Sequence, residues 1–148
     1  MNLKYSDITE KVIGVCMKIH RRLGNGFQEV IYQRCLEIEL KALGLEYERE
    51  KKQNIHYENM CVGRRRVDFL IEEKILIELK AQVKLDDVHL AQAINYIAAF
   101  NLGVGLLINF GAPFLEYRRL HNKRFLPPQR TANPNSPNPD NPSNPKSH

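Results

Sequence analysis

The sequence lacks any apolar segment long enough to cross a membrane. Its 148 residues contain no run of about 18 or more apolar residues, so we expect no transmembrane helix. The first seven residues also lack the apolar centre of a secretory signal. Gly103 and Gly105 are not followed by a pattern that opens a helix, as a phosphate-binding loop requires. These absences argue against a membrane-spanning protein, a secreted protein and a dinucleotide-binding enzyme.

Cysteine is scarce and irregularly placed. The three cysteines, Cys16, Cys35 and Cys61, are odd in number and scattered along the chain. They fit neither a disulfide framework nor a zinc site, nor a four-cysteine iron-sulfur site. We therefore expect a reducing, cytoplasmic location.

Proline is almost absent from the first 126 residues. Only Pro113 lies there, whereas seven of the eight prolines accompany repeated asparagine and serine in residues 127–148. Such a segment cannot bury enough apolar surface to offset its chain entropy. We therefore predict one folded domain over residues 1–126, long enough to bury a substantial core, and a disordered tail over residues 127–148.

Acidic residues are fewer than basic ones. Lysine and arginine number 22 against 17 aspartates and glutamates, a formal net charge of +5, of which residues 127–148 carry +1. A basic surface around a local acidic site suits an enzyme that cuts phosphodiesters, because the polyanion must be attracted while a metal is held. The open alternative is a basic protein with no nucleic-acid role.

A charged triplet between two apolar runs is the most informative stretch. Residues 66–71 and 75–80 are rich in branched apolar side chains and flank residues 72–74, which predicts two strands joined by a tight hairpin. The antiparallel register places Asp68 opposite Glu78, on one face of the sheet. The same register forms an apolar surface on the other face by pairing Ile71 with Ile75, Phe69 with Ile77 and Val67 with Leu79.

Two opposed carboxylates need a compensating charge. Cβ atoms of opposed residues lie roughly 4.5 to 5.5 Å apart, and like charges at that distance repel unless a cation lies between them. Hard oxygen ligands suit Mg²⁺ or Mn²⁺, with several waters retained. Lys80 projects from the same side as Glu78 and could position or deprotonate a water, or hold a phosphate. The alternative is a hairpin with a solvated charged face, which Leu70 and Leu76 beside the acids disfavour.

Three motifs resemble one superfamily. Asp68, followed by residues 78–80 (Glu-Leu-Lys), resembles the D...(D/E)xK signature of the PD-(D/E)xK nuclease-like superfamily, although Val67 stands where many members have proline. Residues 26–32 (Gly-Phe-Gln-Glu-Val-Ile-Tyr) resemble the motif of its GxxExxY family, and residues 92–96 (Gln-Ala-Ile-Asn-Tyr) the QxxxY helix of its RecB-like branch. The resemblance implies a restriction-endonuclease-like core and a Mg²⁺-dependent nuclease acting on DNA. The alternative is a member that has lost catalysis and binds nucleic acid or a protein partner.

The resemblance also implies a set of site residues. They are Glu29, Asp68, Glu78, Lys80 and Gln92, of which the three acids would bind the metal. Glu29 would be a ligand directly or through water, although a glutamate in a first helical turn is also stabilised by backbone amides. Gln92 would hydrogen-bond the region of Lys80 or a nucleotide, with Tyr96 stacked or packed beside it; both are otherwise ordinary helix-surface residues.

Basic residues precede the first strand of the hairpin. Arg64, Arg65 and Arg66 are candidates for substrate binding through backbone phosphates, or they merely solvate the end of the strand. Lys51 and Lys52 are interpreted as plain surface residues.

Periodicity and turn residues predict an α/β domain with a central mixed sheet flanked by helices, in a core order ααβββαβ. Helices are predicted from a cap at Ser6 or Asp7 to about residue 23, from 27 to 43, and from a cap at Asp86 or Asp87 to about residue 100. Strands are predicted over residues 47–57, 66–71, 75–80 and 102–110, with an edge strand over 114–120 and a connection over 58–63.

Overall fold

The computed structural model of the chain describes residues 4–123 and 125–126. The part described contains three helices and five strands. They are α1 Ser6–Leu23, α2 Glu29–Leu43, β1 Tyr47–Tyr57, β2 Met60–Ile71, β3 Ile75–Lys80, α3 Asp87–Ala99, β4 Val104–Asn109 and β5 Glu116–His121. The segment predicted to be a disordered tail lies outside the described residues.

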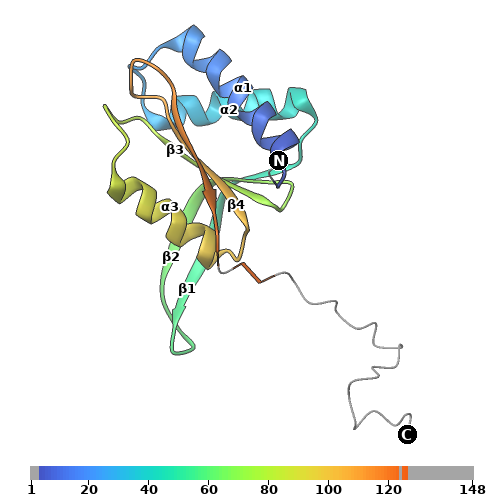
Figure 1. The fold of residues 1–148 in the computed structure, drawn as a ribbon, viewed down its shortest axis with the longest axis vertical. Helices are drawn as coiled ribbons and strands as arrows, with labels where there is room; N and C mark the ends of the chain where they lie inside the picture. Colours follow the sequence, from blue (N-terminus) through green and yellow to red (C-terminus); the bar gives the residue numbers. More distant parts are fainter. Residues whose placement is uncertain (1–3, 124, 127–148) are drawn as a thin grey trace, which may run out of the picture.

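The five strands form one sheet in the order β1-β2-β3-β4-β5. Neighbouring strands are antiparallel except β3 and β4, which run parallel because the chain crosses between them through α3. The sheet lies between α1 and α2 on one face and α3 on the other (Figure 1). The predicted α/β fold with a central mixed sheet is therefore confirmed.

The first two helices each bury one apolar stripe against the sheet. The buried side chains recur at helical spacing, and they are Val12, Cys16 and Ile19 in α1 and Tyr32, Leu36 and Leu40 in α2. Gly24 and Gly44 end the helices with φ of 74° and 72°, a conformation that glycine adopts without steric cost. No helix in the described part of the chain combines the length and the hydropathy needed to span a bilayer.

The starts of two helices differ from the prediction. α1 has Tyr5 as its N-cap with no side-chain hydrogen bond, so the predicted cap by Ser6 or Asp7 is absent. α2 begins at Glu29, two residues later than predicted. The cause is a turn across residues 24–27, in which the buried Tyr32 hydroxyl accepts a hydrogen bond from the amide of Phe27.

The two antiparallel hairpins were predicted with different success. Between β2 and β3, the register pairs Phe69 with Ile77 and Ile71 with Ile75, as predicted. Between β1 and β2, the turn consists only of Glu58 and Asn59, both with positive φ, and pairing resumes at once at Met60. The predicted connection over residues 58–63 is therefore wrong, because Met60, Cys61 and Gly63 already pair with β1.

Both faces of the sheet carry a core. The face under α1 and α2 buries Phe69, Ile77 and Leu79, whereas the face under α3 buries Val67 and Leu76. The prediction that Val67 shares a face with Phe69 is wrong. Side-chain alternation along β2 is interrupted between them, at Asp68, which is where the functional site begins.

Candidate active site

Asp68 lies where regular pairing of β2 is interrupted on both sides. The β2–β3 ladder ends at the pair formed by Phe69 and Ile77, one position before Asp68 would oppose Glu78. On the β1 side, Arg49 pairs with Phe69 and Lys51 pairs with Val67. Glu50, which lies between them with φ of 55°, does not pair with Asp68. The strands therefore leave room for side chains to enter between their backbones.

The two carboxylates fill that opening reciprocally. Asp68 Oδ2 accepts a hydrogen bond from the backbone amide of Leu79 at 2.8 Å. Glu78 Oε1 accepts one from the backbone amide of Asp68 at 3.2 Å. Each acid thus satisfies an amide that a continuous ladder would otherwise pair, and an unsatisfied buried amide is costly. The acids converge because the backbone holds them there.

A glutamine that the sequence interpretation missed fixes the second oxygen of Asp68. Gln33, buried on α2, donates from Nε2 to Asp68 Oδ1 at 2.8 Å. Arg49 in turn donates to Gln33 Oε1 at 3.4 Å and lies 3.8 Å from Glu37. Gln33 is four residues after Glu29, on the same helical face, and that spacing was the signal that would have identified it.

Burial perturbs both acids in the same direction. The pKa of Glu78 is raised from an ordinary 4.5 to about 8, first by burial and then by the neighbouring charge of Asp68, against the opposing effects of the hydrogen bond from the Asp68 amide and of the charge of Lys80. Burial also raises the pKa of Asp68, while the hydrogen bonds from Leu79 and Gln33 lower it. At neutral pH the pair therefore retains a proton that an arriving cation would displace.

Lys80 follows two residues after Glu78 and is half-buried. Its charge lowers the pKa of both acids, so its amine lies within electrostatic reach of the two carboxylates. The backbone is held firmly at this point, because Phe110 donates its amide to the carbonyl of Lys80 and Asn109 bonds both backbone groups of Gln82.

Glu29 lies at the start of α2, half-buried, and its charge raises the pKa of Asp68. The turn before it is fixed by Tyr32, whose hydroxyl donates to the carbonyl of Gly24 at 2.6 Å and whose ring stacks on Phe110. The turn closed by Tyr32 thus fixes the backbone just before Glu29, whose charge acts on Asp68.

The other predicted site residues lie at different depths. Tyr96 is buried on α3, where the guanidinium of Arg65 contacts its hydroxyl and lies 4.5 Å from its ring centroid. Gln92, one turn earlier, is exposed. Arg64 and Arg66 are exposed on β2, and Arg66 lies 3.8 Å from Glu50. Arg65 therefore joins the site to α3, whereas its two neighbours face outward.

The donor set fits a hard divalent cation held by two carboxylates. Asp68 and Glu78 offer oxygens with lone pairs beyond those used by the amides, and Mg²⁺ commonly takes one or two carboxylates and keeps several waters. Among residues 4–123 and 125–126, no three histidine, cysteine or acidic side chains approach closely enough to hold a metal together. Binding by Glu29, directly or through water, stays a prediction.

The sequence of the chain matches the model of a known family. The sequence model of a family described as the PD-(D/E)XK nuclease superfamily matches residues 6–120, a span from the start of α1 to the last residues of β5. No curated protein matches the chain significantly.

The fold also resembles solved structures. The crystal structure of SSO0001 matches with a TM-score of 0.51 and 21% sequence identity, covering 63% of this chain and 49% of that chain. The present chain thus spans about half the length of that protein. At this identity the likeness concerns the arrangement of helices and strands.

Proposed function

The chain belongs to the PD-(D/E)XK nuclease superfamily, and from that premise we propose that it is a Mg²⁺-dependent nuclease that hydrolyses DNA. Members of the superfamily generally use divalent metals. The observation that carries the proposal is the opened β2–β3 ladder, in which Asp68 and Glu78 each accept the other strand's amide beside Lys80. Mn²⁺ would serve the same ligands.

The residues divide the work by position. A bound divalent cation lowers the pKa of water and polarises a phosphoryl oxygen. Asp68 and Glu78 hold the cation, while Gln33 and the Leu79 amide keep the Asp68 carboxylate from rotating. Lys80, whose charge acts on both acids, orients the attacking water.

The finer family assignment is part of the proposal. The turn closed by Tyr32 supports membership of the GxxExxY family, because it gives the tyrosine and the glutamate of that motif linked roles. The QxxxY segment on α3 supports the RecB-like branch, with Gln92 and Tyr96 on the side of the helix that Arg65 approaches. Gln92 and the three arginines would place the DNA strand. We place the protein in the cytoplasm, consistent with its three free cysteines.

Cleavage of linear and circular duplex DNA with and without Mg²⁺ tests the function. Asp68→Asn and Lys80→Met should each lower the rate by roughly 100-fold or more, because each removes a group that acts on the cation or the water. Lys84→Met, at an exposed lysine four residues further on, is the matched control and should cleave at the wild-type rate. Circular dichroism of all variants checks that the fold is kept.

Two outcomes would contradict the proposal. Wild-type cleavage rates in both site variants would remove these residues from catalysis. DNA binding without cleavage at any Mg²⁺ or Mn²⁺ concentration would instead favour the inactive, binding-only alternative.

A further inference from the structure

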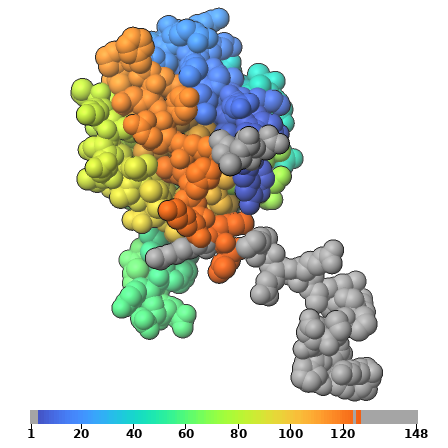
Figure 2. Space-filling view, in the orientation of Figure 1, coloured from blue at the N-terminus to red at the C-terminus, as the bar shows by residue number. Residues whose placement is uncertain are grey.

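The hairpin of β1 and β2 extends well beyond the body of the protein. Its outer part, residues 51–66, which we call the arm, projects past the helices and the rest of the sheet (Figures 1 and 2). None of its residues is buried. At about 3.4 Å per residue, the stretch from Arg66 to Met60 is roughly 20 Å long. The arm therefore adds little to the core that folds the domain.

The net charge of the protein resides mainly in the arm. Residues 51–66 contain five lysines and arginines and one glutamate, a net charge of +4, whereas the whole chain carries +5. The register shows how these charges are arranged, because Lys52 pairs with Arg66 and Asn54 with Arg64. Paired residues share a face of the sheet, so three cations and an amide form one stripe on one face of the arm.

This arrangement of charges lowers the stability of the protein when no ligand is bound. Lys52 lies directly opposite Arg66, and like charges in that position repel. Arg66 has a partial partner in Glu50 at 3.8 Å, but among the described residues no ion pair joins Lys52 or Arg64 to an acid. Arg65, on the other face, is already bound by Tyr96. The unpaired stripe thus favours an anionic ligand.

The stripe leads directly to Asp68, one member of the acid pair. Arg64, Arg66 and Asp68 are alternate residues of β2 and follow one another along the same side of the strand. Asp68 is on the side from which Gln33 of α2 approaches, opposite to the side on which Arg65 meets α3. A polyanion bound along the stripe would therefore continue to the carboxylate of Asp68.

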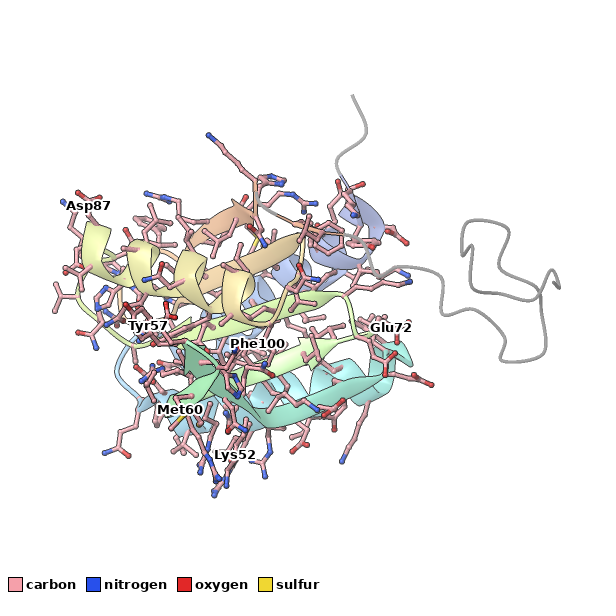
Figure 3. All side chains as sticks on the ribbon, turned by 90° about the horizontal axis from the view of Figure 1, so that it is seen from below. Lys52, Tyr57, Met60, Glu72, Asp87 and Phe100 are labelled. Carbon is pink, nitrogen blue, oxygen red and sulfur yellow. The ribbon has the colours of Figure 1, made fainter. Side chains whose placement is uncertain are left out.

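Exposed apolar side chains flank the turn at the tip of the arm. Tyr57, Met60 and Val62 are 69%, 67% and 63% exposed. Figure 3 views the molecule from the end of the arm, where Tyr57 and Met60 lie at the tip and Lys52 lies among side chains that extend away from the body. Apolar and aromatic side chains at the tip can contact thymine methyl groups or bases.

We propose that the arm inserts into the major groove of duplex DNA and positions the duplex on the acid pair, an inference that rests on the proposed nuclease function. A two-stranded β-ribbon fits the major groove of B-form DNA, which is roughly 12 Å wide. Lys52, Arg64 and Arg66 bind backbone phosphates on the way to the site, and Tyr57 and Met60 contact base edges.

Two other partners fit less well. The deep, narrow major groove of A-form RNA does not admit such a ribbon. A second copy of the chain would bring two arms of charge +4 together at the exposed edge of β1, and those charges would repel.

Binding of a fluorescent DNA duplex in EDTA, measured by anisotropy over a range of salt concentrations, tests the arm apart from catalysis. The double variant Lys52→Gln/Arg64→Gln should bind more weakly, and its log–log salt slope should be smaller by about 1.8, because each phosphate contact contributes about 0.9. Tyr57→Ala/Met60→Ala should weaken binding while keeping the slope, since these side chains carry no charge.

The matched control is Lys41→Gln/Lys74→Gln, which removes the same charge elsewhere. Both lysines are exposed, and Lys74 lies in the β2–β3 turn, at the opposite end of β2 from the tip. This control should keep the wild-type slope. Three results would overturn the arm proposal. The arm and control variants could affect DNA binding equally, or the protein could bind duplex RNA as tightly as duplex DNA. The arm variants could also change the oligomeric state without changing DNA binding.

The same experiments separate the two proposals. Metal-dependent DNA cleavage that does not respond to the arm variants would refute the arm and leave the nuclease function intact. Arm-dependent DNA binding by a protein that never cleaves would refute the nuclease function and support the arm. Melting temperatures of all variants verify that the exposed substitutions leave the fold unchanged.

Discussion

At the scale of single residues, the acid pair serves the backbone and the chemistry at once. Asp68 and Glu78 take the places of ladder hydrogen bonds, so their carboxylates are ordered before any ligand arrives. The hydrogen bond to the Asp68 amide holds the Glu78 carboxylate in a buried position, where its charged form is not solvated by water. The energetic cost of ionising Glu78 is thus built into the folded protein.

That cost makes stability depend on pH. The pKa of Glu78 is about 8 in the folded protein and 4.5 ordinarily, so the folded state holds the proton more tightly. The stabilisation of the folded state by this proton is fully present below about pH 4.5 and is lost as the pH rises through about 8. Glu78→Gln, which keeps an acceptor for the Asp68 amide, should therefore raise the melting temperature at pH 8 in EDTA and leave it nearly unchanged at pH 5.

The exposed turn residue Glu73 provides the control for this prediction. Glu73→Gln should shift the melting temperature little at either pH. A melting temperature of Glu78→Gln that equals the wild-type value at pH 8 would show that Glu78 ionises without strain.

At the scale of elements, the ends of β3 and β4 are locked together behind Lys80. Asn109 is fully buried and bonds the amide and carbonyl of Gln82, the amide of Gly111 and the carboxylate of Glu116. A Cβ at Gly111 would overlap the backbone of Ala81 and Gln82, which cannot move away as a side chain can. Glycine is therefore required where the two chain segments cross.

Gly111→Ala and Gly14→Ala should change stability in opposite directions. Alanine at Gly111 forces the segment after Lys80 out of place and should cost about 2–3 kcal/mol or more. Gly14 lies within α1 with open space around it, so alanine there should add about 0.5–1 kcal/mol of helix stability. Chemical denaturation measures both. A Gly111→Ala protein as stable as the wild type would refute the close approach.

The elements could be predicted from local pattern, and the exceptions have a physical cause. Periodicity predicted the helices and the β2–β3 pairs next to the turn, because burial of one face imposes them, whereas the predicted pairs of Asp68 with Glu78 and of Val67 with Leu79 are absent. Val67 was assigned to the wrong face of the sheet because the side-chain alternation stops at Asp68. The structure shows this interruption through the missing pair between Glu50 and Asp68. Gln33 was missed, although it follows Glu29 by one helical turn, because its contact with Asp68 joins residues 35 positions apart in the sequence. The arm was not recognised as a binding surface, because Lys52 was interpreted as a plain surface residue and only the strand pairing places it beside Arg66.

At the scale of the whole molecule, the positive charge and the acid pair occupy different regions. The arm carries a net +4, and the rest of the chain carries about as many acids as bases. Without a metal, the raised pKa of Asp68 and Glu78 lowers the negative charge that faces an approaching phosphate. Attraction of DNA should therefore depend on the arm and not on the metal.

This separation predicts that chelation uncouples binding from cleavage. In EDTA the protein should bind duplex DNA with an affinity within a few-fold of that in Mg²⁺, because the arm makes the phosphate contacts that release counterions from the DNA. Cleavage should stop completely, since the water and the phosphoryl oxygen lose their activating cation. Anisotropy and gel assays on the same duplex measure the two effects, with Ca²⁺ in place of Mg²⁺ as a control for divalent charge. Loss of binding together with cleavage would mean that DNA is held chiefly through a metal at Asp68 and Glu78, and that the arm has only a minor role.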